Sequence, residues 1–148
     1  MYSAFVYVPL IIILGIATYT DLKERLIYNW LNFPGMLYFL VYHVLFNTSH
    51  LLDYILGFLV LGGVSFLIDL FTNSIGGGDI KLFALIGMAV GLHTGLYVYF
   101  FSFATASFIG LPILILGKIF PNHIKIKNIP MAPFIALGTL ITYIVIQN

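Results

Sequence analysis

The sequence has no cysteine and very few charged residues, and each absence excludes a class of function. Without cysteine, the chain can form no disulfide, no thiolate-bound zinc site and no thiol nucleophile. Charged residues make up 7% of the 148 positions and hydrophobic residues 61%, and the mean hydropathy is +1.10. Soluble domains carry about 25% charged residues, so this composition predicts a polytopic membrane protein.

Apolar runs fill nearly the whole chain. They predict an all-α fold with six transmembrane helices in one bundle, a single domain over residues 1–148. Stretches such as "VPLIIILGIA" are apolar on every face and lack the alternation of a transmembrane β-strand. The predicted spans are Ala4–Tyr19, Phe33–Phe46, Leu51–Phe71, Ile80–Gly91, Leu96–Leu116 and Met131–Ile146. Gly87, Gly91 and Gly95 fall four apart, which favours close helix packing.

The basic residues lie in or beside the first, third and fifth predicted connections. They are Lys23, Arg25, Lys81, Lys118, Lys125 and Lys127. The second and fourth connections and both termini carry none of them. By the positive-inside rule, the first, third and fifth connections face the cytoplasm, and both termini face the outer side of the cell (inner) membrane. The net charge of +1 gives no indication of a nucleic-acid partner.

Two of the five acidic residues fall at the same predicted membrane depth. Asp21 follows the first span and Asp79 precedes the fourth, so both lie on the cytoplasmic side. Two adjacent carboxyl groups share one proton, so that one activates water while the other protonates a carbonyl. The helix dipoles favour ionised Asp79 and disfavour ionised Asp21, so we expect Asp21 to hold that proton. This is the chemistry of an aspartyl protease.

Three glycines, Gly76, Gly77 and Gly78, directly precede Asp79. Without Cβ atoms they can adopt positive φ and admit the extended main chain of a substrate. A flexible turn whose aspartate only caps the following helix explains the same four residues equally well.

The motifs resemble those of the prepilin and preflagellin peptidases, which are membrane aspartyl proteases with a G-x-G-D signature. "GGGDIK" (residues 76–81) fits that signature, and "DLKERLIYNW" (21–30) is similar to the first aspartate motif of the family. "IPMAPFIALG" (129–138) is similar to its proline-containing entry to the last helix. The three motifs occur in the family order.

The resemblance implies an endopeptidase that removes the short basic leader of type IV pilin-like precursors, next to their hydrophobic helix. Asp21 and Asp79 match the catalytic pair of the family, and Gly76 and Gly78 match its glycines. Lys23, Asn29 and Lys81 match accompanying positions, where interfacial anchoring of the lysines is the ordinary explanation. The sequence leaves open whether the precursor is a pilin, a pseudopilin, a competence pilin or an archaellin, and it leaves the oligomeric state open.

Two departures from the family pattern affect these expectations. Tyr28 stands where proline is usual before Asn29, which puts the shape of that turn in question. The larger family members carry an additional amino-terminal segment that is associated with N-methylation. Because this chain resembles the short form without that segment, we expect proteolysis without methyl transfer.

The remaining polar residues have ordinary explanations. Asp69 can hydrogen-bond near the pair or contact the basic leader, although solvation at the interface explains it too. Asp53 is expected to cap a helix start. His43, His50, His93 and His123 share no metal-ligand spacing, so we expect them at the interfaces and expect no metal or cofactor.

Two other classes of function fit the same acids. In a small proton-coupled transporter subunit, Asp21, Asp69 and Asp79 would relay protons. In an assembly scaffold with an inactive protease site, the aspartates would be dispensable. A relay needs acids staggered through the membrane, whereas Asp21 and Asp79 are predicted at one face.

Overall fold

The structure is a computed structural model that describes residues 4–73, 75–119 and 130–147. In these ranges all regular secondary structure is helical. The elements are α1 (Ala4–Glu24), α2 (Asn29–Phe46), the short 3₁₀ helix η1 (Thr48–His50), α3 (Leu51–Thr72), α4 (Gly77–Ile119) and α5 (Ala132–Gln147). The all-α class is therefore confirmed.

Helix α4 contains a break at Gly91. Gly91 has φ 82° and ψ 174°, which is outside the helical region, so α4 consists of a first segment (77–90) and a second segment (92–119). The chain turns at Gly91 itself, so residues 92–95, which were predicted as the fourth connection, belong to the second helical segment. A glycine alone reverses the direction of the chain here, because few other residues adopt this φ and ψ.

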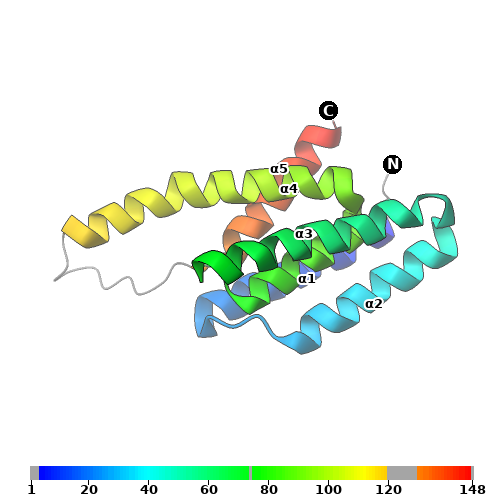
Figure 1. Cartoon of the computed structure of the whole chain (residues 1–148), viewed down its shortest axis with the longest axis horizontal. Helices are drawn as coiled ribbons and strands as arrows, with labels where there is room; N and C mark the ends of the chain where they lie inside the picture. Colours follow the sequence, from blue (N-terminus) through cyan, green and yellow to red (C-terminus); the bar gives the residue numbers. More distant parts are fainter. Residues whose placement is uncertain (1–3, 74, 120–129, 148) are drawn as a thin grey trace.

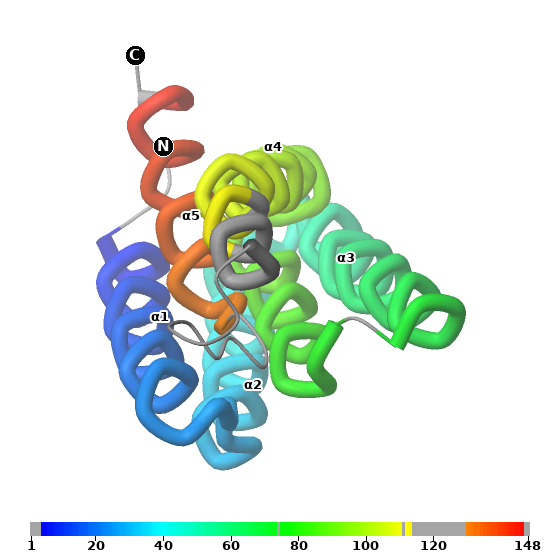
Figure 2. The backbone as a smooth tube through the Cα atoms, turned by 90° about the vertical axis from the view of Figure 1, so that its left-hand side faces the viewer, coloured from blue at the N-terminus to red at the C-terminus, as the bar shows by residue number. Residues whose placement is uncertain are grey.

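The first segment of α4 forms the centre of the molecule. Residues 82–90 are all buried, with α1, α2 and α3 around them (Figure 2). Helix α5 packs on α4 and α1. At the closest crossing, a Cβ on Gly57 of α3 or on Gly87 of α4 would collide with the backbone of the other helix. The predicted close packing is confirmed for Gly87, and for Gly95, where a Cβ would lie 2.9 Å from the Leu61 side chain.

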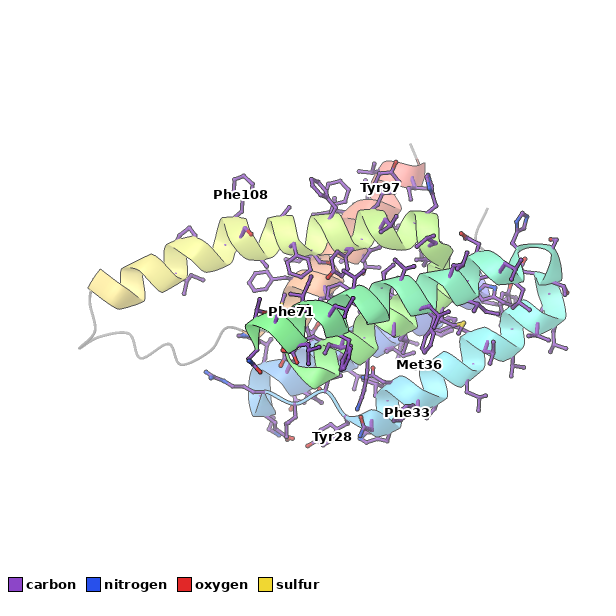
Figure 3. The ribbon with its side chains drawn as sticks, in the orientation of Figure 1. Tyr28, Phe33, Met36, Phe71, Tyr97 and Phe108 are labelled. Atoms are coloured by element: carbon purple, nitrogen blue, oxygen red, sulfur yellow. The ribbon has the colours of Figure 1, made fainter. Side chains whose placement is uncertain are left out.

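Three helical stretches in the described residues are long and apolar enough to cross a membrane: Ala4–Glu24, Thr48–Thr72 and Gly77–Gly110. Ala132–Ile146 is a shorter apolar helix. Many large apolar side chains, such as Phe108, project from the surface (Figure 3), as expected where lipid takes the place of water. These helices support a multi-pass membrane protein. The number of six spans and the side on which the termini lie stay predictions.

The helices alternate in direction. Helix α1 begins, and α5 ends, near the right-hand side of Figure 1, and the connection from α2 to α3 lies at that end as well. The connections from α1 to α2 and from α3 to α4 lie at the opposite end of the bundle. We call this the dyad end, because Asp21 and Asp79 lie there.

Candidate active site

Asp21 lies in the last turn of α1, and its side chain is only 7% exposed. Its Oδ2 accepts a hydrogen bond of 2.9 Å from the backbone N–H of Ala132, the first residue of α5. The first N–H groups of a helix have no partner within the helix and carry partial positive charge. Asp21 therefore caps a helix that is 111 positions away in the sequence, and this contact stabilises its ionised form.

Asp79 lies in the first turn of α4 and is 8% exposed. Its carboxyl group has a hydrogen bond with the backbone of Gly76, while its Oδ1 is buried without a partner among the described residues. Its own backbone N–H donates to the Gly76 carbonyl at 3.0 Å. A buried carboxylate with an unpaired oxygen is costly, so the neutral acid is the favoured form in this position.

The two carboxyl groups are close enough that the charge of Asp21 acts on Asp79. Both acids are thus buried at one end of the bundle, and their direct pairing stays a prediction. The predicted location of the shared proton is not supported: Asp21 has the hydrogen bond that favours an anion, and Asp79 has the unpaired oxygen. For Asp21, the sequence argument considered only the carboxyl end of the helix that carries it, α1. It missed the amino end of α5, whose N–H reaches Asp21.

The three glycines have separate surroundings. A Cβ on Gly78 would lie 2.8 Å from Cβ of Ile27, in the connection from α1 to α2. A Cβ on Gly76 would lie 3.0 Å from Oδ2 of Asp79, and one on Gly77 would meet nothing within 4 Å. In the described residues, Gly91 is the glycine with positive φ, so the expected positive φ at residues 76–78 was wrong. Gly78 serves close packing between the elements that carry Asp21 and Asp79.

The connection from α1 to α2 keeps the shape that proline would impose. Tyr28 has φ −73° and ψ 141°, and proline holds φ at about −65 ± 15°. The replacement of the usual proline therefore leaves the entry to α2 intact. The Tyr28 hydroxyl donates a hydrogen bond to the Glu24 carboxylate, and the loss of that bond on ionisation raises the pKa of Tyr28.

Of the accompanying polar residues, Lys81 and Asn29 come together. The Lys81 Nζ donates a 2.7 Å hydrogen bond to Oδ1 of Asn29 and lies 5.6 Å from the centre of the Phe33 ring. This bond joins the first turn of α2 to α4, two residues after Asp79. Lys23 is exposed and lies over the Tyr19 ring at 5.7 Å, a position that fits interfacial anchoring.

Asp69 organises the connection from α3 to α4. Its Oδ1 accepts a 3.1 Å hydrogen bond from the backbone N–H of Ile75, and its carbonyl accepts one of 2.7 Å from Asn73. Asn73 has φ 49°, the left-handed conformation that ends many helices. Asp69 thus holds the segment that leads into Gly76–Asp79.

At the other end of α3, the carboxylate of Asp53 lies against Gly91, and no side chain caps the helix start there.

Sequence reasoning missed two buried polar residues near this site and misplaced a third. Asn32 on α2 is 0% exposed, and within the described part of the chain neither of its amide atoms has a hydrogen-bond partner; the same holds for the buried Oγ1 of Thr18, one turn before Asp21. A lone asparagine inside "WLNFPG" was the available signal. His43 is fully buried, not interfacial: Nε2 lies 3.1 Å from the Ala89 carbonyl, and the ring stacks on Tyr54. His123 lies outside the described residues.

The helical bundle with two buried carboxyl groups at one end defines an apolar membrane protein with a candidate aspartate pair. The chain belongs to the type IV leader peptidase family, whose model matches residues 8–111. That range contains Asp21, Asp79 and the glycines before it. The family resemblance inferred from the motifs is therefore confirmed, and membership does not favour the transporter interpretation.

One relative gives a second comparison. The chain is 28% identical over 152 residues to the "Prepilin leader peptidase/N-methyltransferase" of Bacillus subtilis (strain 168). The alignment covers 97% of this chain and 56% of that protein, so the chain spans little more than half the length of its relative. No solved structure matches the chain.

Proposed function

We propose that this protein is a membrane aspartyl endopeptidase that removes the short basic leader from type IV pilin-like precursors, with Asp21 and Asp79 as the catalytic pair. The observation that carries the proposal is the burial of two carboxyl groups from distant helices, Asp21 and Asp79, at the same end of the bundle. Membership of the leader peptidase family supports it. The basic residues around the dyad end favour a cytoplasmic site in the cell membrane, where a basic leader is held by its own charge.

The contacts of the two acids suggest distinct roles. Ionised Asp21 takes a proton from a water molecule, whose oxygen attacks the carbonyl carbon of the scissile bond. Protonated Asp79 gives its proton to the carbonyl oxygen, which yields a neutral tetrahedral diol. Asp21 then returns its proton to the leaving amine nitrogen, and one diol hydroxyl returns a proton to Asp79 as the C–N bond breaks. Both acids end in their starting states.

Purified protein and a synthetic precursor test the proposal. Wild type should shorten the precursor by its leader, while Asp21→Asn and Asp79→Asn should each lower turnover at least about 100-fold, the usual contribution of a general acid or base. Asp53→Asn is the matched control, because Asp53 lies in the first turn of α3 at the opposite end of the bundle. Near-wild-type cleavage by Asp79→Asn would rule the pair out.

A further inference from the structure

A groove opens between α2 and α3 beside the candidate catalytic pair. It has a volume of about 340 Å³ and is lined by apolar side chains, including Phe33 and Met36 of α2 (Figure 3) and Phe58 and Phe66 of α3. Helices α2 and α3 each pack on α4 but contact each other little. The first segment of α4 therefore forms the floor of the groove.

The floor of the groove begins directly after Asp79. Ile80 and Lys81 line it, and Ala84 continues it one turn further along α4. Lys81 places a positive charge in the groove lining at its dyad end, and a hydrogen bond to Asn29 fixes the position of its ammonium group. On the other side of the pair, the start of α5 covers Asp21. An apolar segment that enters this groove thus reaches Ile80 and Lys81, the two residues that follow Asp79 in the first turns of α4.

Two glycines of α3, Gly62 and Gly63, line the groove and permit close approach of other helices. Gly62 is pressed onto α4, since a Cβ there would lie 2.8 Å from Cβ of Ala84. Gly63 also lines the groove, and a Cβ there would meet nothing within 4 Å. In lipid, helices associate through packing and small residues rather than through exclusion of water. Gly63 therefore leaves room for the backbone of another helix.

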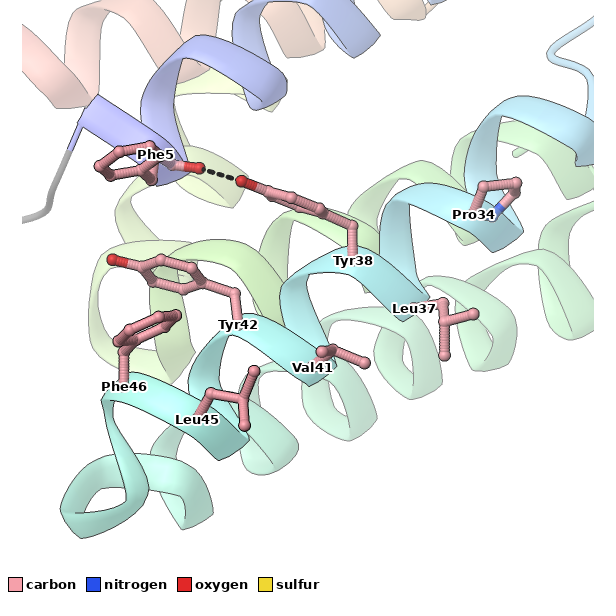
Figure 4. Close-up of a pocket in the computed structure, with 8 residues that line it drawn as sticks. All are labelled: Phe5, Pro34, Leu37, Tyr38, Val41, Tyr42, Leu45 and Phe46. Carbon is pink, nitrogen blue, oxygen red and sulfur yellow. Dashed lines mark hydrogen bonds between the residues drawn. The ribbon is translucent and has the colours of Figure 1, made fainter.

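We propose that this groove binds the hydrophobic helix of the precursor substrate, so that the bond at the start of that helix lies over Asp21 and Asp79. The inference rests on the proposed function, because the occupant is the substrate of that reaction. An apolar helix fits the apolar walls, and the groove ends at Ile80 and Lys81, next to Asp79 in α4. A larger groove, about 770 Å³, runs along α2 from Pro34 to Phe46 and Phe5 (Figure 4), but it leads to the opposite end of the bundle.

Filling the groove tests the proposal. Gly63→Leu places a side chain in the open space without a collision, and it also replaces glycine by a good helix former. Gly15→Leu is the matched control, since Gly15 lies in α1, outside this groove, and its Cβ would also meet nothing within 4 Å. With full-length precursor in liposomes, Gly63→Leu should raise KM at least about tenfold with little change in kcat, while Gly15→Leu should match wild type.

Photocrosslinking reports binding without cleavage. A benzoylphenylalanine in place of Phe66, within the groove, should crosslink the hydrophobic helix of the precursor in an Asp79→Asn background. The same group in place of Val41, in the larger groove, should not. Equal KM values for both leucine variants, or crosslinks from position 66 to lipid only, would overturn the proposal that this groove binds the precursor helix. Absence of cleavage by wild type, with crosslinks at position 66 retained, would overturn the proposed function instead.

Discussion

At Asp21, one hydrogen bond joins the candidate catalysis to the assembly of the fold. Its carboxylate accepts a hydrogen bond from the N–H of Ala132. This bond favours the anionic form of Asp21 and also anchors the start of α5. Among the described residues, Asp79 has no such bond on Oδ1, and its carboxyl group has a hydrogen bond with the backbone of Gly76. The described contacts of the two acids therefore differ at Oδ1 of Asp79, which is buried without a partner among the described residues.

Substitutions at Asp21 should separate these two roles. Asp21→Asn keeps an amide oxygen that can accept from Ala132, so we expect loss of cleavage with nearly unchanged thermal stability in detergent. Asp21→Ala removes the acceptor and should lower the free energy of unfolding by about 1 kcal/mol, as the loss of a helix cap does. Thermal unfolding followed by circular dichroism measures both. Equal destabilisation by the two variants would mean that the Ala132 contact contributes nothing.

Asn32 provides a second test at the residue scale. Its amide is fully buried with no hydrogen-bond partner among the described residues, and such a group costs about 1–3 kcal/mol. Leucine has the same number of side-chain heavy atoms, so Asn32→Leu should raise the melting temperature in detergent. Asn29→Leu serves as the contrast, because it removes the partner of Lys81. A lower melting temperature for Asn32→Leu would show that the amide has a partner, such as a buried water molecule.

At the scale of elements, the most informative feature is the break in α4. It allows one uninterrupted apolar stretch of sequence to supply two helices: the first segment is buried in the centre, and the second packs against α5. The carboxylate of Asp53 fills the space beside Gly91, where a Cβ would have to stand. Both the backbone angles of Gly91 and the carboxylate of Asp53 therefore disfavour a residue with a Cβ at this position.

Gly91→Ala should be destabilising for both reasons. Alanine at φ 82° and ψ 174° costs about 1–3 kcal/mol, and its Cβ collides with Asp53. Gly63→Ala is the control and should be neutral or slightly stabilising, because it lies in open space within a helix. Adding Asp53→Ala to Gly91→Ala should recover part of the lost stability. Unfolding temperatures of the four proteins in one detergent decide the matter, and a Gly91→Ala variant as stable as wild type would refute the strain argument.

At the scale of the whole molecule, the alternation of the helices brings the first and third connections to one end. The connection from α2 to α3 lies at the other end, with the start of α1 and the end of α5 (Figure 1). This arrangement brings Asp21 and Asp79 together although they are distant in sequence. It also gives the molecule two chemically different ends, because Lys23, Arg25 and Lys81 all lie at the dyad end.

The absence of cysteine makes the orientation directly measurable, since a single introduced thiol is the only one in the chain. Leu26→Cys and Ser49→Cys place exposed thiols at opposite ends of the bundle. By the positive-inside rule, an impermeant thiol reagent should label the Ser49→Cys variant in intact cells and the Leu26→Cys variant only after permeabilisation. The reverse pattern would place the candidate site outside the cytoplasm.

The sequence alone determined the class of protein and the two candidate acids. The low charge content of the sequence predicted apolar membrane helices. Because successive helices alternate in direction, the count of spans between them placed Asp21 and Asp79 at the same end of the bundle. The helix starts were less accurate: α2 begins at Asn29 rather than Phe33, and α4 at Gly77 rather than Ile80, because polar first turns carry no hydropathy signal.

Only the tertiary structure decided which acid has a hydrogen-bond donor and which is left unpaired. Ala132 reaches Asp21 because α5 packs against α1, and no local pattern near residue 21 encodes that contact. The same holds for the space beside Gly91, which the Asp53 carboxylate occupies, and for the groove between α2 and α3, which exists because both helices pack on α4 and contact each other little. Local composition determines where helices form, whereas the partner of a buried polar atom depends on which distant backbone is packed beside it.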